Sequence, residues 1–369
     1  MQISDQDTRF MSLALALGRR GLGNTWPNPA VGAVIVRDDG GTPAVVGRGW
    51  TQPGGRPHAE TEALRRAGTA ARGATMYVTL EPCSHHGKTP PCADAIVAAG
   101  IRRVVSAIED PNPEVAGQGH ARLRAAGIAV EVGVGADEAR RAHAGHIRRI
   151  VDGRPHITLK LALSADGKAG LAERRPVAIT GEAVRAQVHR LRAMNDAILI
   201  GIGTALADDP QLTCRLPGME KFSPVRVVLD AQLRLRPDSA LARSARETPV
   251  WVVTAPDASS DAARALRAQG VEVLHAPAQA GRLDLAAVLG LLAGRGITRL
   301  MVEGGPIVAA AFVAADLVDA AVLFRSPKVI GPDGIAALEG LGVDALTGKL
   351  ASQGREPVGD DSVEFFARA

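Results

Sequence analysis

Residues 58–60 read His-Ala-Glu, and residues 81–92 read Glu-Pro-Cys-Ser-His-His-Gly-Lys-Thr-Pro-Pro-Cys. The side chains of His58, Cys83 and Cys92 are three donors of the kind that bind zinc. Three protein ligands leave the fourth coordination position open for water, as in catalytic zinc sites and unlike closed structural ones. We therefore predict a catalytic zinc ion at this stretch.

Glu60 stands two residues after the histidine, and we interpret it as a proton carrier and not as a ligand. In zinc deaminases a metal-activated water attacks an amidine carbon of a base, and a glutamate outside the metal shell transfers protons to the departing ammonia. The apolar spacing after His58 predicts a helix that ends near Gly68. Cys92 follows two prolines and is predicted to begin a second helix that ends at Gly100, because proline favours helix starts and glycine favours helix ends.

Each feature has a simpler interpretation when it is taken alone. A histidine near a helix start is usually capped or solvated, and two cysteines can be small buried hydrophobic residues. Both cysteines here directly follow a proline, and the histidine and glutamate accompany them. The whole pattern is therefore much more specific than any of its parts.

At these residues the chain resembles the deaminase half of the bifunctional riboflavin-biosynthesis proteins. In that family a diaminohydroxyphosphoribosylaminopyrimidine deaminase is fused to a 5-amino-6-(5-phosphoribosylamino)uracil reductase. The long spacer between the cysteines separates the motif from that of most cytidine deaminases. The resemblance implies an α/β chain: a cytidine-deaminase-like three-layer domain over residues 1–152 and a dihydrofolate-reductase-like domain over residues 153–369.

Length, composition and charge are consistent with this organisation. The chain has 369 residues, of which 46% are hydrophobic and only 3% aromatic, and that length is more typical of two domains than of one. The formal net charge of +4 comes from 43 basic and 39 acidic side chains spread along the chain. A weak positive balance suits phosphate-bearing small molecules at least as well as nucleic acid.

Cysteine usage and the termini bear on location. Two of the three cysteines are the proposed ligands and the third is Cys214, so we expect no disulfide framework and a reducing, cytoplasmic setting. The first residues are polar and acidic, and no apolar run approaches the roughly 20 residues of a membrane span. We therefore expect a soluble protein without a secretion signal.

The N-terminal half offers further candidates for substrate binding. Asn28 lies in a proline-rigid turn and can either contact a pyrimidine edge or fix its own turn; the residues alone leave both open. The family resemblance favours the substrate, since Thr-x-Pro-Asn-Pro-x-Val-Gly is preserved at residues 25–32. A basic helix is predicted over 137–151. The loop between the cysteines carries polar side chains that can meet a phosphate or remain solvated: His85, His86 and Lys88.

The second half continues the resemblance. Residues 160–168 follow the order Lys-x-Ala-x-Ser-x-Asp-Gly-Lys of the family's reductase half. An apolar strand is expected to break into Gly-x-Gly-Thr at 201–204 and an acidic turn. An ordinary Rossmann fingerprint is absent from the sequence. The best candidate for holding cofactor phosphates is the glycine turn at 303–306, because it precedes a helix predicted over 306–315 and offers free amides; a turn that merely needs small residues is the alternative.

The resemblance implies that this half uses NADPH, and it implies roles for individual residues. The nucleotide contacts are expected from Ala162, Thr204, Asp208, Gly304, Gly305, Pro306 and Ile307. The substrate contacts are expected from Lys160, Arg192, Leu212, Arg215 and Glu303. Two arginines suit a phosphate monoester, because guanidinium makes bidentate contacts. A strand over 362–366 is predicted to close the sheet at its edge.

The chain departs from its family just before residue 179. Many relatives carry Gly-x-Ser-x-Trp there, and this chain has Pro176 and Ala178 at the positions of the Ser and the Trp. We hypothesise that the neighbouring Arg174 and Arg175 engage the 2′-phosphate that distinguishes NADPH from NADH. A solvated basic loop is the alternative.

The sequence as a whole predicts an enzyme with two activities. One half replaces the ring amino group of a phosphoribosylated diaminopyrimidinone by oxygen, and the other reduces the ribosyl chain to ribityl. The alternative is a nucleic-acid base deaminase with a C-terminal binding module, but single-strand recognition usually needs aromatic platforms, and the chain has one Tyr and three Trp. A purely structural zinc protein would leave Glu60 unexplained. We expect a homo-oligomer with no nucleic-acid or membrane partner.

Overall fold

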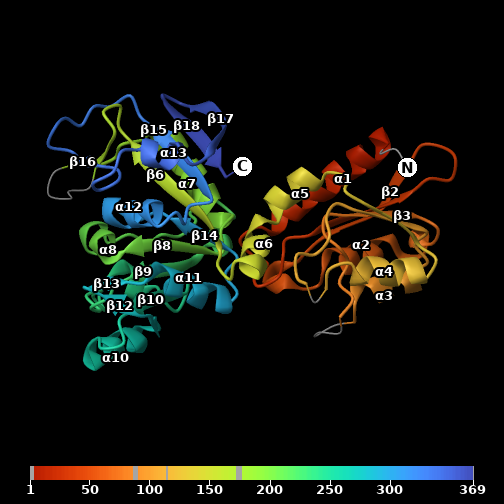
Figure 1. Cartoon of the computed structure of the whole chain (residues 1–369), viewed down its shortest axis with the longest axis horizontal. Coiled ribbons are helices and arrows are strands. Elements are labelled where there is room, and N and C mark those ends of the chain that lie inside the picture. Colours follow the sequence, from red (N-terminus) through yellow and green to blue (C-terminus); the bar gives the residue numbers. More distant parts are fainter. Residues whose placement is uncertain (1–3, 86–89, 114, 172–176, 369) are drawn as a thin grey trace. The chain divides into compact units, whose positions relative to one another are not determined.

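A computed structural model describes residues 4–85, 90–113, 115–171 and 177–368. The chain divides into two compact units, Met1–Arg154 and Pro155–Ala369, whereas the sequence predicts the boundary after residue 152. Each unit has its own sheet and its own helices (Figure 1). None of the described helices is long and apolar enough to cross a membrane.

The first unit is a five-stranded sheet between two layers of helices. The strand order is β2-β1-β3-β4-β5; β1 is antiparallel to both neighbours and the other pairs are parallel. Helices α1 and α5 cover one face, and α2, α3 and α4 cover the other (Figure 1). The elements are α1 (Asp5–Gly18), β1 (Gly32–Arg37), β2 (Ala44–Trp50), α2 (Ala59–Ala67), β3 (Thr75–Val78), α3 (Cys92–Ala98), β4 (Arg103–Ser106), α4 (Gln118–Ala125), β5 (Ala129–Val132), α5 (Ala136–Ala142) and α6 (Ala144–Val151). This is the three-layer arrangement that the sequence predicts.

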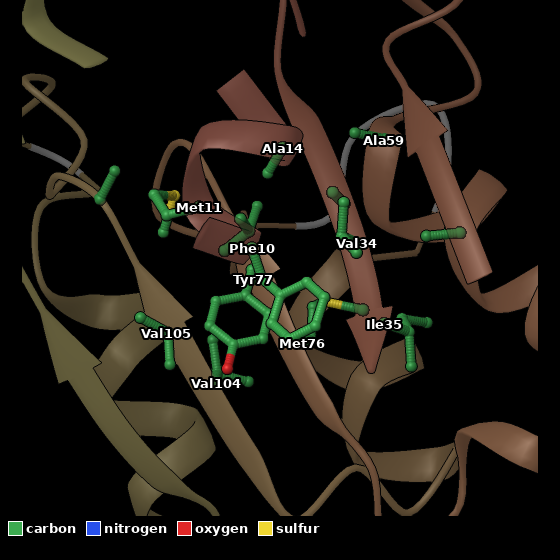
Figure 2. Close-up of a cluster of buried hydrophobic side chains, with 14 of the residues drawn as sticks. Phe10, Met11, Ala14, Val34, Ile35, Ala59, Met76, Tyr77, Val104 and Val105 are labelled. Carbon is green, nitrogen blue, oxygen red and sulfur yellow. The ribbon is translucent and has the colours of Figure 1, made fainter. Parts of the chain in front are cut away.

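The core of the first unit forms where α1 packs on the centre of the sheet (Figure 2). The rings of Phe10 on α1 and Tyr77 on β3 lie with centroids 5.4 Å apart. The Tyr77 hydroxyl donates to Asp7 Oδ1 at 2.8 Å, and Arg103 donates to both oxygens of Asp7 at 2.8 and 3.0 Å. The buried carboxylate is thus paired, which offsets the cost of removing it from water.

The single helix predicted over 137–151 is wrong, because the chain breaks it into α5 and α6. His143 lies between them with φ −94° and ψ 10°. Its ring is buried, and Nε2 lies 3.0 Å from Thr79 Oγ1. Helical periodicity alone cannot show this break, since the partner on the sheet is distant in sequence.

The second unit is a nine-stranded sheet of order β11-β10-β9-β8-β14-β6-β15-β18-β17. Neighbours from β11 to β15 are parallel, and β18 and β17 are added antiparallel. The strands of this sheet are β6 (His156–Leu163), β8 (Ala197–Gly201), β9 (Val225–Leu229), β10 (Val250–Thr254), β11 (Glu272–His275), β14 (Arg299–Val302), β15 (Ala320–Arg325), β17 (Ala351–Val358) and β18 (Asp361–Ala367). Two further antiparallel sheets have two strands each: β7 (Lys168–Gly170) pairs with the distant β16 (Ile335–Ala336), and β12 (Ala278–Gln279) forms a hairpin with β13 (Arg282–Leu283).

Helices connect the parallel strands, as such strands require. The described helices of this unit are α7 (Glu182–Ala193), α8 (Ile202–Asp208), α9 (Ala240–Arg243), α10 (Ser260–Gln269), α11 (Leu285–Gly294), α12 (Pro306–Ala314) and α13 (Asp344–Thr347). Two features differ from expectation. Helix α8 begins directly after β8, where the sequence suggests only a glycine motif and an acidic turn. The predicted edge strand over 362–366 is not at the edge, since β18 lies between β15 and β17; the edge strand β17 is almost wholly exposed and has no apolar alternation.

Candidate functional sites

The three predicted zinc ligands come together in the first unit. One donor atom from each of His58, Cys83 and Cys92 lies within 4.8 Å of the others. Helix α2 begins directly after His58, and α3 begins at Cys92, which confirms the two predicted helix starts. His58 Nδ1 is 3.6 Å from Cys83 Sγ and 3.4 Å from Cys92 Sγ.

This geometry fits zinc. In tetrahedral zinc with ordinary bond lengths, a sulfur ligand and a nitrogen ligand lie about 3.5 Å apart. The two distances from His58 Nδ1 to the cysteine sulfurs are close to this value. A hydrogen bond from the Cys92 side chain, aided by His58, lowers the pKa of Cys83 to about 4. The same contact raises the pKa of Cys92. The pair therefore shares a proton of the kind that metal binding displaces.

Glu60 lies on the first turn of α2 and is buried. Burial, followed by the nearby Cys83 thiolate, raises the pKa of Glu60 to about 7. A carboxyl group that titrates near neutrality can both accept and return a proton, as general acid–base catalysis requires. Glu60 does not belong to the group of converging donors, in keeping with its predicted role outside the metal shell.

The other predicted residues of this unit are only partly described. Asn28 Nδ2 donates to Gly55 O at 3.0 Å, so the amide nitrogen stabilises the local turn and a substrate contact would fall to the amide oxygen. His86 and Lys88 lie outside the described residues. The same holds for Arg174, Arg175 and Pro176 of the second unit.

A second group of potential donors consists of Glu81, Glu109 and His120. Both oxygens of the buried Glu81 carboxylate already accept main-chain N–H groups at 2.8–3.1 Å, from Asp110, Gly117, Gly119 and His120. A carboxylate has about four lone-pair sites, so these bonds fill it. This group therefore anchors the chain after β4 and does not suit a metal ion.

The second unit contains a cavity of about 430 Å³ at the ends of β6, β8 and β14. Nearly all the residues that the sequence assigns to the reductase site line it: Lys160, Ala162, Arg192, Thr204, Asp208, Leu212, Glu303, Gly304, Gly305 and Pro306. Ile307 and Arg215 are not among the lining residues. Ile307 is 41% exposed on the first turn of α12, and Arg215 Nη1 lies 3.3 Å from Gln211 Oε1.

The Glu303 carboxylate forms ion pairs with two basic side chains that also line the cavity, those of Lys160 and Arg192. Lys160 Nζ lies 3.3 Å from Glu303 Oε1, and Arg192 donates to both carboxylate oxygens at 3.0 Å. Burial alone raises the pKa of Glu303, but Lys160 and Arg192 outweigh it and hold that pKa below its ordinary value. One negative and two positive groups leave a net positive charge, which suits a phosphorylated ligand.

The glycine turn locks against α8. Gly305 N donates to Thr204 Oγ1 at 3.0 Å, and a Cβ at Gly305 would lie only 2.9 Å from that oxygen. Gly305 caps α12, which starts with Pro306 as predicted. A side chain at position 305 would therefore crowd Thr204, and Gly304, Gly305 and Pro306 all line the cavity.

Gly203 of the expected Gly-x-Gly-Thr motif and Ala178, at the position of the family's Trp, also line the cavity. Several other lining residues were not anticipated from the sequence: Ala169, Gly170, Val177, Ile179, Thr180, Arg185, Ala207, Pro210, Ile335 and Ala337. Arg185 carried a usable signal, because it precedes Arg192 by two helical turns on the same face of α7. Ile335 carried none, since β16 reaches the cavity only through its pairing with β7.

Each of the two units matches a known protein family. Residues 4–108 match the cytidine and deoxycytidylate deaminase zinc-binding region, and residues 155–361 match the RibD C-terminal domain. The chain is 42% identical to the riboflavin biosynthesis protein RibD of Escherichia coli, over 91% of this chain and 92% of the relative. It is 41% identical to RibD of Aquifex aeolicus over 99% of each chain. The chain belongs to the RibD family.

Solved structures of RibD proteins agree with this assignment. One structure of Acinetobacter baumannii RibD matches with a TM-score of 0.85 at 35% identity, covering 99% of each chain. A Thermotoga maritima structure, a diaminohydroxyphosphoribosylaminopyrimidine deaminase/5-amino-6-(5-phosphoribosylamino)uracil reductase, matches with a TM-score of 0.84 at 34% identity, covering 98% of this chain and 99% of that one. As a RibD family member, the chain is a bifunctional enzyme of riboflavin biosynthesis with a zinc-binding deaminase domain and an NADPH-dependent reductase domain. The predicted resemblance and fold class are confirmed.

Proposed function

We propose that this chain acts twice on one phosphoribosylated pyrimidine. It first deaminates 2,5-diamino-6-(5-phosphoribosylamino)pyrimidin-4(3H)-one by hydrolysis. It then reduces the ribosyl chain of 5-amino-6-(5-phosphoribosylamino)uracil to ribityl with NADPH. The observation that carries the proposal is the convergence of His58, Cys83 and Cys92 beside the buried Glu60, in one chain with a cationic cavity.

In the deaminase domain, residues 1–152 by our assignment, His58, Cys83 and Cys92 hold the zinc ion. When bound, zinc supplies a water that is acidic enough to react near neutral pH. Glu60 would take the two protons of that water in turn, passing one to the adjacent ring nitrogen and one to the ring amino group, so that ammonia leaves and a carbonyl oxygen takes its place. Glu60 is buried beside these ligands, where a general acid–base group can make both transfers. Asn28 orients the pyrimidine through its amide oxygen.

In the reductase domain, residues 153–369, NADPH supplies the hydride that the ribosyl carbon accepts. Lys160 donates the accompanying proton to the sugar oxygen; among the described residues that line the cavity it is the only amine, and arginine holds its proton too tightly for this role. Arg192 and Arg215 bind the substrate phosphate, and Leu212 and Glu303 shape the substrate side. The cofactor lies against Ala162, Thr204, Asp208 and the turn from Gly304 to Ile307.

The test separates the two activities in one preparation. Without NADPH, the diaminopyrimidine substrate should yield one ammonia per molecule and accumulate the deaminated product. Adding NADPH should then consume one equivalent and give the ribityl compound, followed by mass spectrometry. Ammonia release from a cytosine-containing oligonucleotide, with no NADPH consumed on the pyrimidine, would instead favour the base-deaminase alternative.

We also propose a cytoplasmic location and a homo-oligomeric state. The cysteines Cys83, Cys92 and Cys214 are all free, as a reducing compartment allows. The exposed edge strand β17 offers unpaired main-chain groups to a second copy. Light scattering of the purified protein would give the number of copies, and a monomer at micromolar concentration would contradict the proposed assembly.

A further inference from the structure

The turn that follows α8 has an unusual backbone. Asp209 and Leu212 lie in the left-handed region, with φ values of 37° and 57°. Residues with side chains rarely adopt this conformation; aspartate does so more readily than most, whereas a bulky residue such as leucine is an outlier there. Such a conformation persists only where the surrounding structure over-determines it, and it is common at ligand sites.

Every second residue of this turn lines the cavity, namely Asp208, Pro210 and Leu212. The residues that alternate with them are not among the lining residues. Each of them is instead held by a hydrogen bond from another segment. These residues are Asp209, Gln211 and Thr213. The carbonyl oxygen of Thr213 accepts a hydrogen bond from Arg192 Nη1 at 3.1 Å.

The other two anchors come from residues outside the cavity lining. Asp209 Oδ1 accepts the main-chain N–H of Ala240 at 2.8 Å. Arg226 Nη1 donates to Gln211 O at 3.1 Å. The turn is thus bonded to two separate parts of the unit, through the side chain of Asp209 and through the main chain of Gln211. Both bonds hold the side of the turn that faces away from the cavity.

Arg226 on β9 is the largest fully buried side chain among the described residues. Its remaining hydrogen bonds go to Ser244 Oγ at 2.8 Å, to Ser244 O at 3.0 Å and to Thr248 O. Burial lowers its pKa to about 10, so it stays charged at neutral pH. A buried cation is costly to desolvate, and here the Nη donors go to oxygens of the turn and of the segment that follows α9, while Nε has no hydrogen-bond partner among the described residues.

We propose that Asp209 and Arg226 are positioning residues of the reductase, which hold the turn 208–213 in its left-handed conformation before any ligand arrives. They thereby set where Asp208 and Leu212 meet cofactor and substrate. A turn that is ordered on folding does not have to be ordered on binding, so affinity depends on these anchors more than the chemical step does. This inference rests on the proposed reductase function.

The decisive comparison is Asp209→Ala with Asp209→Asn in the full chain. Alanine removes the acceptor for Ala240 N–H and disfavours positive φ, whereas asparagine keeps an oxygen and tolerates that conformation. We expect Asp209→Ala to weaken NADPH binding, measured by fluorescence titration, and to raise the KM for the pyrimidine, each by about tenfold, comparable to one hydrogen bond. The kcat should stay within about threefold, and Asp209→Asn should behave like the wild type.

Arg226→Lys is the second variant, because lysine keeps the charge but cannot reach all the oxygens that the guanidinium contacts. It should shift the same two constants in the same direction. The deaminase rate of each preparation depends on the other unit and should not change. Circular dichroism and the stoichiometry of NADPH binding measure the folded fraction.

Three outcomes would overturn the inference. One is an unchanged NADPH affinity in Asp209→Ala. The second is Asp209→Asn binding as weakly as Asp209→Ala. The third is a kcat that falls with the folded fraction while KM is unchanged, which would make the anchors merely structural. Failure of the wild type to bind NADPH would remove the proposed function and the inference with it.

Discussion

The two active sites of this chain differ in how far along the sequence their parts are spread. In the first unit, the proposed zinc donors all come from residues 58–92, and the starts of α2 and α3 position two of them. In the second unit, the lining of the cavity comes from segments between residues 160 and 337. The first site is a point at which three atoms meet, and the second is a surface shared by many segments. Single substitutions should therefore abolish the first activity and only weaken the second.

The strongest test of this contrast is Cys83→Ala. Removing one of three ligands should release most of the zinc, about one equivalent per chain in the wild type, and abolish deamination. The reductase rate should be unaffected, since its cavity lies in the other unit. Elemental analysis and both assays measure this. Cys214→Ala is the matched control, because that buried cysteine lies in the reductase unit; unchanged zinc in Cys83→Ala would remove the assignment.

Glu60→Gln should lower the deaminase rate by about 10²- to 10⁴-fold, the usual contribution of a general acid–base group. Glutamine has nearly the same shape but cannot carry the proton, so zinc content and reductase activity should be retained. Glu62→Gln, two residues later in the same first turn of α2, tests whether any loss is specific. A near-normal rate in Glu60→Gln would assign the proton transfer to another group.

Glu303→Gln should weaken the reductase without abolishing it. The variant leaves Lys160 and Arg192 without their shared carboxylate, and we expect kcat/KM to fall by about 10- to 100-fold, as for the loss of hydrogen bonds to charged groups. Deamination should be unchanged. Glu356→Gln on the exposed strand β17 is a matched control. Complete loss of reductase activity would show that this site, too, depends on a single group.

Replacing Arg174 and Arg175 together by alanine tests the departure from the family. If they engage the 2′-phosphate, NADPH binding should weaken by about 1–3 kcal/mol, the range for hydrogen bonds to a charged group, and NADH binding should hardly change. Titration with both cofactors makes the comparison. Equal weakening of both, or of neither, would reject this role and leave the remaining cavity residues as they are.

The smallest expected effect concerns the stability of the first unit alone. Arg103 lowers the pKa of Asp7 from 3.8 to about 2, so the stabilisation is fully present above the unfolded value and is lost as the pH falls through the folded one. The free energy of unfolding of the wild type should exceed that of Asp7→Asn by about 1–2 kcal/mol at neutral pH. The difference should shrink as the pH falls from about 4 to about 2.

Urea unfolding followed at Tyr77 isolates this effect, because it is the only tyrosine of the chain and its hydroxyl contacts Asp7. Trp251 lies on β10 of the second unit, and it serves as the internal control in a background where Trp26 and Trp50 of the first unit are replaced by phenylalanine. A difference between the two proteins that does not depend on pH would mean that the ion pair contributes through packing and not through its charge.

Local patterns were sufficient wherever a residue's role depends on its near neighbours. The proline before Cys92 marks the start of α3, and Gly305, which follows β14, marks the start of α12. The structure confirms both helix starts. His143 was not predictable in this way, because its partner Thr79 lies on a different layer. The edge strand β17 was missed because both of its faces are polar and exposed.

The sequence by itself predicted the chemical groups of both sites: the zinc donors and the glutamate beside them from the residues, and the charged residues of the reductase from the family resemblance. Only the tertiary structure decided that Lys160 and Glu303 meet, because β6 and β14 become neighbours in the sheet although a long stretch of chain separates them. It also decided that Arg226 donates a hydrogen bond to Gln211 O in the turn beside the cavity. Parallel strands bring distant segments to one edge of a sheet, and no local pattern in the chain records which strands will be adjacent.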